Sequence, residues 1–511
     1  MKDKQIKFGI VLQYLQMGLN IIINLVYTPI MIRILGNSEY GIYQLVSSII
    51  SYLNLLSLGF GASYIRFYSR YKAVNDEEGV KKLNGLFLIV FTIMGIVAVI
   101  AGLFISFNVE MFFNDTYTSS DLDIARVLMI FLTINLSISF PASVFISYIT
   151  SQEKFIFQKL VNIGKTVLSP ILSIALLYLG YGSIGMVIVT TAISIIIDTI
   201  NVLYCILKLK MKFSFKNPNL KLLKEIAIFS LFIAINQIID QINWQTDKII
   251  LGKMTTSTVV AIYAVASTIN SMYLNFSTAI SNVYVPRVNR IVASSTNEEE
   301  TNDKLTDLMI KVGRLQFFVI MLILTGFIFF GKYFIYRWAG ENYEDAYYIT
   351  LLLICPVTIP LIQNLGIEIQ RAKNKHQFRS IICLIVAILN VGISIWFCTL
   401  WGAIGTALGT TLSLIIGNII IMNIYYQKAL GINIIKFWKK ILKSIPAFII
   451  PVICGICLMI FYSFNSLIDF GLIMIAYTII YFINVLLFGL NKEEKTGLKN
   501  KLNMIFHKSK I

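Results

Sequence analysis

Two stretches of this 511-residue chain, GSIGMVIVTTAISIII at residues 182–197 and GAIGTALGTTLSLIIG at residues 402–417, match at a displacement of 220 residues. Both open with Gly-X-Ile-Gly and continue, at the same spacing, to a Thr-Thr pair and an Ile-Ile pair. A weaker match at nearly the same displacement relates residues 42–50 to residues 262–269. Hydrophobic chains built from two similar halves are common among transporters, with the substrate path between the halves. The repeat therefore indicates transport rather than catalysis.

The composition is that of a multi-span membrane protein. Hydrophobic residues make up 57% of the chain and charged residues only 14%, and the mean hydropathy is +0.77. A membrane-spanning helix needs about 20 predominantly apolar residues. Such segments are predicted at residues 8–32, 40–65, 83–107, 124–149, 161–180, 184–207, 223–246, 257–284, 312–336, 346–369, 379–400, 402–426, 441–463 and 467–490, which gives an all-α protein with 14 transmembrane helices.

The distribution of basic residues predicts the orientation, because cytoplasmic loops carry an excess of Lys and Arg. With the N-terminus inside, all but six of the 43 lysines and arginines fall on the inner side. Both termini are then cytoplasmic, and the net charge of +17 is explained without a nucleic-acid partner. The six basic residues on the outer side are Arg33, Arg126, Lys248, Lys253, Lys332 and Arg337.

The repeat and the spans together predict the domain organisation. Residues 1–220 form an N-terminal lobe of six helices, and residues 221–440 form a second lobe of six. Because six is even, both lobes have the same orientation and are related by an axis along the membrane normal. Residues 441–511 add helices 13 and 14 and a basic cytoplasmic tail.

Polar side chains recur at helical spacing in the first two spans of each half. Amides and hydroxyls are costly in hydrocarbon, so they should either hydrogen-bond between helices or line a water-filled path. Recurrence in both halves favours the path, since both halves are expected to contribute walls. The predicted cavity-lining residues are Gln16, Asn20, Asn24, Gln44, Ser47, Ser51, Asn54, Asn236, Ser267 and Ser271.

Two arginines end corresponding spans. Arg66 follows the second span and Arg287 the eighth, within one residue of the 220-residue displacement. They are either inside-positive anchors whose heads reach the interface, or a pair of cations at the inner mouth of the path. The second interpretation suits a phosphate or pyrophosphate ligand. Lys165, about one turn inside the fifth span, needs a counter-ion, an anionic substrate or a route to the interface. We predict that it binds the pyrophosphate together with Arg66 and Arg287.

Three acids are candidates for ion coupling. Asp198 lies in the sixth span, Asp240 in the seventh, and Asp247 directly follows the seventh on the same polar stripe. They could serve as counter-ions for the basic groups or as H⁺ or Na⁺ sites. Asp240 and Asp247 have uncharged counterparts in the first half, so energy coupling is expected to depend on this asymmetry.

Signatures of enzymes, cofactors and metals are missing from the sequence. The only two histidines lie in basic segments, and no phosphate-binding loop with Gly-Lys-Ser/Thr occurs. We therefore predict no catalytic residues, no cofactor and no metal site, and expect transport to be driven by an ion gradient, the membrane potential or the substrate gradient.

Several motifs resemble those of a known family. Residues 33–36 (RILG), 39–43 (EYGIY) and 58–61 (LGFG), followed by Arg66, are similar to the N-terminus of bacterial Wzx-type polysaccharide flippases. These belong to the multidrug/oligosaccharidyl-lipid/polysaccharide exporter (MOP) superfamily, and residues 247–252 (DKIILG) resemble the matching stretch of its second half.

The resemblance implies a flippase in the bacterial cytoplasmic membrane that moves undecaprenyl-pyrophosphate-linked oligosaccharide through a cationic, V-shaped cavity by alternating access, for surface polysaccharide biosynthesis. It implies that Arg66 and Arg287 contact the substrate and that polysaccharide polymerase machinery is a candidate partner. Asp198 and Asp240 depart from a purely cationic cavity. An ion-coupled exporter of drugs or organic cations is the alternative; a membrane-embedded enzyme would need a large outer loop or a membrane histidine.

Overall fold

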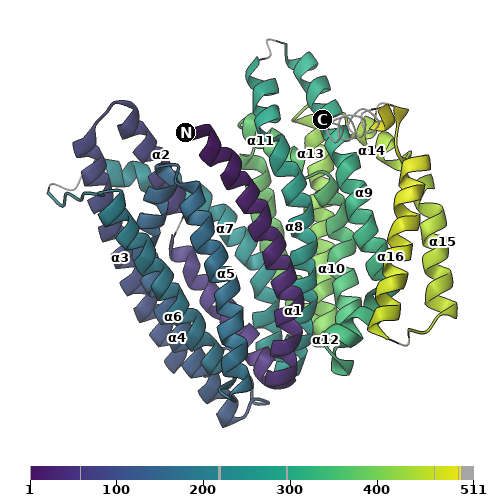
Figure 1. Ribbon diagram of the computed structural model, residues 1–511, viewed down its shortest axis with the longest axis horizontal. Coiled ribbons are helices and arrows are strands. Elements are labelled where there is room, and N and C mark those ends of the chain that lie inside the picture. The colour runs from purple at the N-terminus through teal and green to yellow at the C-terminus, as the bar shows by residue number, and fades with distance from the viewer. Residues whose placement is uncertain are drawn as a thin grey trace, which may run out of the picture. The chain divides into compact units, whose positions relative to one another are not determined.

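The computed structural model describes residues 2–57, 59–216, 220–294, 297–464, 466–492 and 494–496, so most of the predicted basic tail lies outside the described residues. Every regular element in these ranges is a helix (Figure 1). The α-helices are α1 (Lys2–Ser51), α2 (Phe60–Ala73), α3 (Glu77–Phe107), α4 (Ser119–Ser151), α5 (Phe155–Tyr178), α6 (Gly182–Leu203), α7 (Leu220–Met254), α8 (Ser257–Ser294), α9 (Glu298–Trp338), α10 (Asp345–Ile362), α11 (Leu365–Ala372), α12 (Gln377–Leu414), α13 (Met422–Lys428), α14 (Ile434–Leu442), α15 (Pro446–Phe461) and α16 (Leu467–Asn484).

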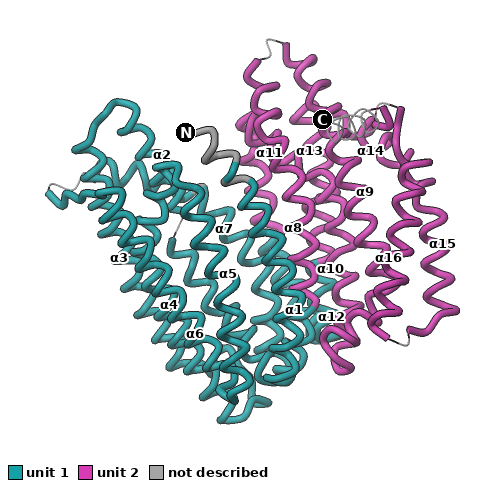
Figure 2. Tube along the Cα trace, viewed as in Figure 1, with its two compact units in different colours: residues 1–265, 387–410 teal, residues 266–386, 411–511 magenta. Residues whose placement is uncertain are grey.

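Contacts group these helices into two compact units (Figure 2). Unit 1 contains residues 1–265 and 387–410, and unit 2 contains residues 266–386 and 411–511. Part of α12 therefore belongs with α1 to α7 rather than with its sequence neighbours. These units are defined by contacts, whereas the predicted lobes are defined by the sequence repeat. The division into two repeat lobes therefore stays a prediction.

Eleven helical segments in the described part of the chain are long and apolar enough to cross a membrane, or up to twelve if the bent pair of α14 and α15 forms one span. Two of them, Val11–Ala73 with 63 residues and Gln377–Lys428 with 52, are much longer than one crossing needs. Each contains a break in its helical backbone, at Gly36 and at Trp401–Gly402 respectively. The protein is thus all-α and crosses the membrane many times, while the total of fourteen spans and the cytoplasmic termini stay predictions.

The repeated Gly-X-Ile-Gly pattern has a backbone explanation. Gly182 has φ 58°, and Gly402 has φ 55° and ψ −128°, a region that side-chain-bearing residues rarely adopt. The second glycine allows a close approach: a Cβ on Gly405 would lie 2.0 Å from the carbonyl oxygen of Phe397. The two copies of the repeat therefore begin with the same left-handed glycine.

An aromatic cluster organises the part of unit 1 around α2. The ring of Tyr64 meets that of Phe87 edge-on, with centroids 5.1 Å apart. The Tyr64 hydroxyl donates a hydrogen bond of 2.5 Å to Asn84 Oδ1, and Asn84 Nδ2 donates to the carbonyl of Lys212 at 2.8 Å. These bonds satisfy polar groups that would be costly to bury alone and fix α2 against α3.

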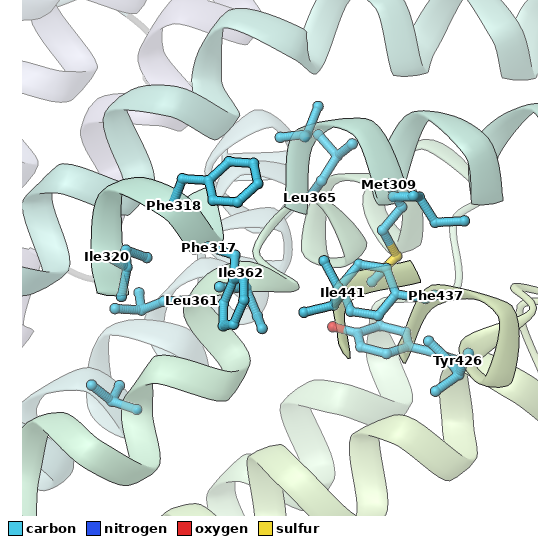
Figure 3. Packing of buried hydrophobic residues seen from close by; sticks show 14 of the residues in the cluster. Met309, Phe317, Phe318, Ile320, Leu361, Ile362, Leu365, Tyr426, Phe437 and Ile441 are labelled. Atoms are coloured by element: carbon cyan, nitrogen blue, oxygen red, sulfur yellow. The ribbon is translucent and has the colours of Figure 1, made fainter. Parts of the chain in front are cut away.

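Unit 2 has a hydrophobic core to which α9, α10, α13 and α14 contribute together with α8, α11, α15 and α16; part of it is seen in Figure 3. Phe437 and Ile441 of α14 lie beside Met309 of α9 in this view. The contact is close, because a Cβ on Gly313 of α9 would be 2.7 Å from Phe437 Cε2. Helix α14 is therefore seated directly on the backbone of α9.

A buried arginine ties together three segments of unit 2. Arg314, only 5% exposed, donates to both carboxylate oxygens of Glu494 at 2.8 Å. It also donates to the carbonyl of Lys440 at 2.9 Å, to Ser444 Oγ at 2.7 Å and to the carbonyl of Gly489 at 2.7 Å. A buried guanidinium is tolerated only when paired and hydrogen-bonded. Here it joins α9, which carries it, to the end of α14 and to the chain after α16.

Candidate functional site

The most deeply buried acid of unit 1 is Asp247, near the end of α7. It is 3% exposed, and its neighbour Lys248 is 8% exposed. The hydroxyl of Tyr263 from α8 and Oγ1 of Thr410 from α12 both donate hydrogen bonds to Asp247 Oδ2, the latter at 2.8 Å. Three helices thus converge on one carboxylate.

Further oxygen atoms surround this carboxylate. Ser394 Oγ donates to Asn390 Oδ1 at 3.1 Å and approaches the carbonyl of Thr406 at 3.3 Å, while Asn390 Nδ2 donates to Thr410 Oγ1 at 3.4 Å. Asp247 Oδ1 is buried and accepts no hydrogen bond from the described residues. One carboxylate among hydroxyl, amide and carbonyl oxygens suits a hard monovalent cation or a proton rather than a transition metal. No cluster of three His, Cys, Asp or Glu side chains occurs in the described residues.

A second feature of unit 1 is the contact between α2 and α7. The Cζ atom of Arg66 lies 4.3 Å from the ring centroid of Phe229, over its face. One turn further along α2, Arg70 pairs with Glu225 at 3.3 Å, and both of these side chains are exposed. Arg66 has no carboxylate within 4.0 Å in the part of the chain that the structure describes, so its N–H donors remain available for an anion.

The polar faces of α1 and α7 hydrogen-bond to each other at one end. Ser48 Oγ donates to Gln245 Oε1 at 3.0 Å, and Gln241 Nε2 donates to Ser51 Oγ. Ser51 therefore takes part in a helix–helix contact, which is one of the two roles that the polar stripe left open.

The remaining residues predicted to line a cavity are spread over both units. In unit 1, Asn20, Asn24 and Asn54 are exposed, while Gln16, Gln44, Ser47 and Asn236 are partly buried. Gln44 donates to the hydroxyl of Tyr40 at 3.0 Å. In unit 2, Ser267 is partly buried, and Ser271 is exposed and donates to the carbonyl of Ser267 at 2.9 Å. A role as cavity lining stays a prediction for all ten.

The predicted charged residues also fall into different surroundings. Asp198 of α6 is partly buried and accepts a hydrogen bond of 3.4 Å from Ser139, and Lys165 of α5 is the cation that interacts with it electrostatically. Asp240 is exposed, as are Lys165 and Arg66. Arg287, also exposed, belongs to α8 in unit 2. The structure thus places Lys165 and Asp198 on the packed helices α5 and α6 of unit 1 with no ion pair between them, and places Asp247 in a separate buried cluster.

Sequence reasoning identified Asp247 but missed most of its partners. Tyr263 and Thr410 were visible as repeat positions, yet nothing linked them to an acid. Asn390 and Ser394 lie four residues apart on α12, the spacing of one helix face, which is a signal that could have found them. Nothing in the sequence indicates that Phe229 contacts Arg66, because aromatic residues are common in apolar helices.

Charged and polar groups held inside long apolar helices are typical of membrane transporters. A model of the family described as polysaccharide biosynthesis protein matches residues 9–292, more than half of the chain. The chain belongs to this family. The match places the protein among polysaccharide biosynthesis proteins.

Solved structures show the same fold at low sequence identity. The lipid II flippase MurJ in an inward closed conformation aligns with a TM-score of 0.73 and 17% identity, covering 94% of this chain and 98% of that one. An inward-facing MATE multidrug resistance transporter of the MOP superfamily aligns with a TM-score of 0.66 and 15% identity, covering 83% of this chain and 96% of that one. A MOP superfamily transporter from Pyrococcus furiosus aligns with a TM-score of 0.55 and 15% identity, covering 83% of this chain and 95% of that one. No curated protein matches the chain significantly.

Proposed function

We propose that this protein flips undecaprenyl-pyrophosphate-linked oligosaccharide units from the inner to the outer leaflet of the bacterial cytoplasmic membrane. Membership of the polysaccharide biosynthesis family supports the pathway. The observation that carries the substrate class is Arg66, an exposed guanidinium held over the Phe229 ring with no carboxylate partner among the described residues. Planar N–H donors of this kind bind phosphate oxygens in pairs.

Arg287 is the second cation in this proposal. It is exposed on α8, ahead of the helix end at Ser294, as Arg66 is exposed on α2. Two such groups would neutralise the two phosphates of a pyrophosphate as the substrate enters. The polysaccharide polymerase that would receive the flipped unit is a candidate partner.

A cell-based complementation experiment tests the substrate role. In a deletion strain, Arg66→Ala and Arg287→Ala should abolish surface polysaccharide while the protein stays in the membrane at wild-type amounts. Arg70→Ala is the matched control, because Arg70 lies one turn away and pairs with Glu225 on the surface, where an ion pair contributes little. Normal polysaccharide from both alanine variants would contradict the proposal. Loss of drug resistance in Asp240→Asn, with Arg66→Ala unaffected, would instead support the organic-cation exporter.

We also infer that transport is coupled to H⁺ or Na⁺ at Asp247. The support is the buried Oδ1 atom, which accepts no hydrogen bond from the described residues, on a carboxylate whose Oδ2 accepts from Thr410 of α12, next to Asn390. Binding an ion there would stabilise the packing of α7 and α8 on α12, and release would loosen it. Flipping in proteoliposomes under an imposed Na⁺ gradient, compared with an imposed pH gradient, identifies the ion; equal rates without any gradient would contradict coupling.

A further inference from the structure

Helix α14 presents three different faces. Its residues Ile434, Phe437 and Ile441 are buried in the core of unit 2. Ile435 and Leu442, seven residues apart, are 62% and 52% exposed. The remaining face is basic and contains Lys436, Lys439, Lys440 and Lys443. Because these four are spaced by three, four and seven residues, they lie on one side of the helix.

The basic face is held in place rather than displayed on a loop. Asn433 caps the helix by accepting a hydrogen bond of 2.8 Å from the backbone N–H of Lys436. Arg314 holds the other end by donating to the carbonyl of Lys440 and to Ser444 Oγ. Figure 3 shows Phe437 and Ile441 pointing into the core. The lysines are therefore fixed relative to the spanning helices of unit 2.

Most of this charge is not neutralised within the protein. Lys436 pairs with Asp307 of α9 at 2.8 Å. Lys439, Lys440 and Lys443 have no carboxylate within 4.0 Å in the described ranges. The three side chains border a hollow of about 660 Å³ that Ile435 and Leu442 also line. Positive charge and exposed apolar surface thus meet on one open stretch of the α14 surface.

The chain around α14 identifies the level at which this hollow lies. Helix α15, which is apolar, follows after a bend of 51°. Ile445, which directly precedes α15, and Ile449 in its first turn continue the exposed apolar strip, at 46% and 52% exposed. An amphipathic helix with a basic face and an exposed apolar face lies where headgroups meet acyl chains.

We propose that α14 binds the phosphate of an anionic phospholipid, such as phosphatidylglycerol, with Lys439, Lys440 and Lys443 around the headgroup and Ile435 and Leu442 against the acyl chains. Charge complementarity selects the anionic lipid, and the adjacent apolar strip favours a lipid over a soluble polyanion or a nucleic acid. The proposal does not depend on which substrate the protein transports.

Native mass spectrometry tests whether α14 binds an anionic phospholipid. The full-length protein in uncharged detergent is titrated with phosphatidylglycerol or with phosphatidylcholine. The triple variant K439Q/K440Q/K443Q should lose phosphatidylglycerol affinity on the order of 100-fold, since each lysine near an anionic surface contributes about fivefold. Its weak binding of phosphatidylcholine should not change. The matched control is K208Q/K210Q/K216Q, which removes three exposed lysines from a segment of unit 1.

A second variant separates a lipid from a free anion. I435S/L442S keeps all four lysines and should also weaken phosphatidylglycerol binding, whereas it should not alter any binding of inorganic phosphate. Unchanged phosphatidylglycerol affinity in the lysine variant would overturn the proposal, and so would an equal loss in the unit 1 control. Displacement of the lipid by inorganic phosphate or by an RNA oligonucleotide at equal concentration would overturn the assignment to lipid. Melting temperatures in phosphatidylcholine nanodiscs verify that each variant is folded.

Discussion

Thr410 donates a hydrogen bond of 2.8 Å to Asp247, although 163 residues separate them in the chain. Its counterpart in the first repeat, Thr190, donates instead to the carbonyl of Val187 in its own helix, at 3.0 Å. The reason is visible in the sequence, because Tyr27 stands where the displacement of 220 residues would place an acid. One repeated threonine thus has two roles, and only the second copy contacts a carboxylate.

Replacing Asp247 by Asn should reduce gradient-driven flipping about 10- to 100-fold, the usual cost of losing a charged hydrogen-bond acceptor. The shape of the site is preserved, so protein abundance should stay close to wild type. Flipping of a fluorescent lipid-linked sugar in proteoliposomes, with and without an ion gradient, measures the effect. A variant that keeps its full gradient response would rule out Asp247 as the coupling site.

Thr410→Val should weaken ion binding about tenfold, since it removes a donor that orients the Asp247 carboxylate. Thr190→Val is the matched control, because the same change at the repeat-equivalent position removes only a bond within α6. Isothermal titration with Na⁺, or the pH dependence of flipping, reports the difference. Equal losses in the two variants would show that the Asp247 contact has no special role.

Phe229→Leu should weaken substrate binding about 3- to 30-fold while leaving the protein folded. The physical reason is loss of the cation–π contact that holds Arg66, which contributes roughly 0.5–2 kcal/mol. Phe229→Trp should retain or strengthen binding, because Trp is the better cation–π partner. The apparent affinity for a pyrophosphate-linked substrate is the measurement, and equal affinities for the Leu and Trp variants would contradict a positioning role for the ring.

Glu494→Ala should destabilise the protein by about 3 kcal/mol at pH 7, since it leaves the Arg314 charge buried without a partner. Burial alone would raise the pKa of Glu494, but hydrogen bonds from Arg314 and from the backbone of Asn491, together with the charge of Arg314, lower it below 4.5. Because the pKa of Glu494 is lower in the folded state, its ionised carboxylate stabilises the protein fully at pH values above the ordinary pKa of glutamate. This stabilisation is lost as the pH falls through the folded-state pKa.

The difference in melting temperature between wild type and Glu494→Ala should therefore be largest near neutral pH and shrink below pH 4.5. Melting curves in detergent between pH 7 and pH 3.5 provide the test. A difference that stays constant over this range would show that ionisation of Glu494 contributes nothing.

Gly402→Ala should cost about 1–3 kcal/mol, because the backbone there has φ 55° and ψ −128°. Gly392→Ala, ten residues earlier in α12, is the control: its surroundings are open and its backbone is helical, so alanine should be neutral or stabilising by up to about 1 kcal/mol. Melting temperatures of the two variants should move in opposite directions or differ clearly. Equal shifts would mean that the break at Gly402 is not conformationally demanding.

Much of the fold could be predicted from the sequence, because apolar length and glycine position are local properties. Long apolar runs correctly predicted a helical, multi-span protein, and the family confirms the resemblance carried by RILG and EYGIY. The repeated Gly182 and Gly402 proved to have matching φ values. By contrast, the glycines that end the RILG and DKIILG motifs differ in conformation: Gly36 breaks a helix, whereas Gly252 lies inside α7 against Leu45.

The candidate site could be predicted only in part, because its geometry depends on contacts between distant segments. Asp247 stood out as a charge in an apolar helix, but its partners Tyr263 and Thr410 are 16 and 163 residues away. Arg314 was counted only as an inside-positive residue, since neither Glu494 nor the carbonyls it contacts could be foreseen from spacing.

The Arg314–Glu494 pair has a consequence for biogenesis. Arg314 is synthesised 180 residues before Glu494, which corresponds to roughly 10–40 s of translation. During that interval α9 has entered the membrane with a guanidinium whose partner does not yet exist, so this part of unit 2 can mature only when the last segment arrives. The ion pair therefore makes completion of the chain a condition for stable insertion, and polypeptides released before residue 494 would be exposed to membrane quality-control proteases.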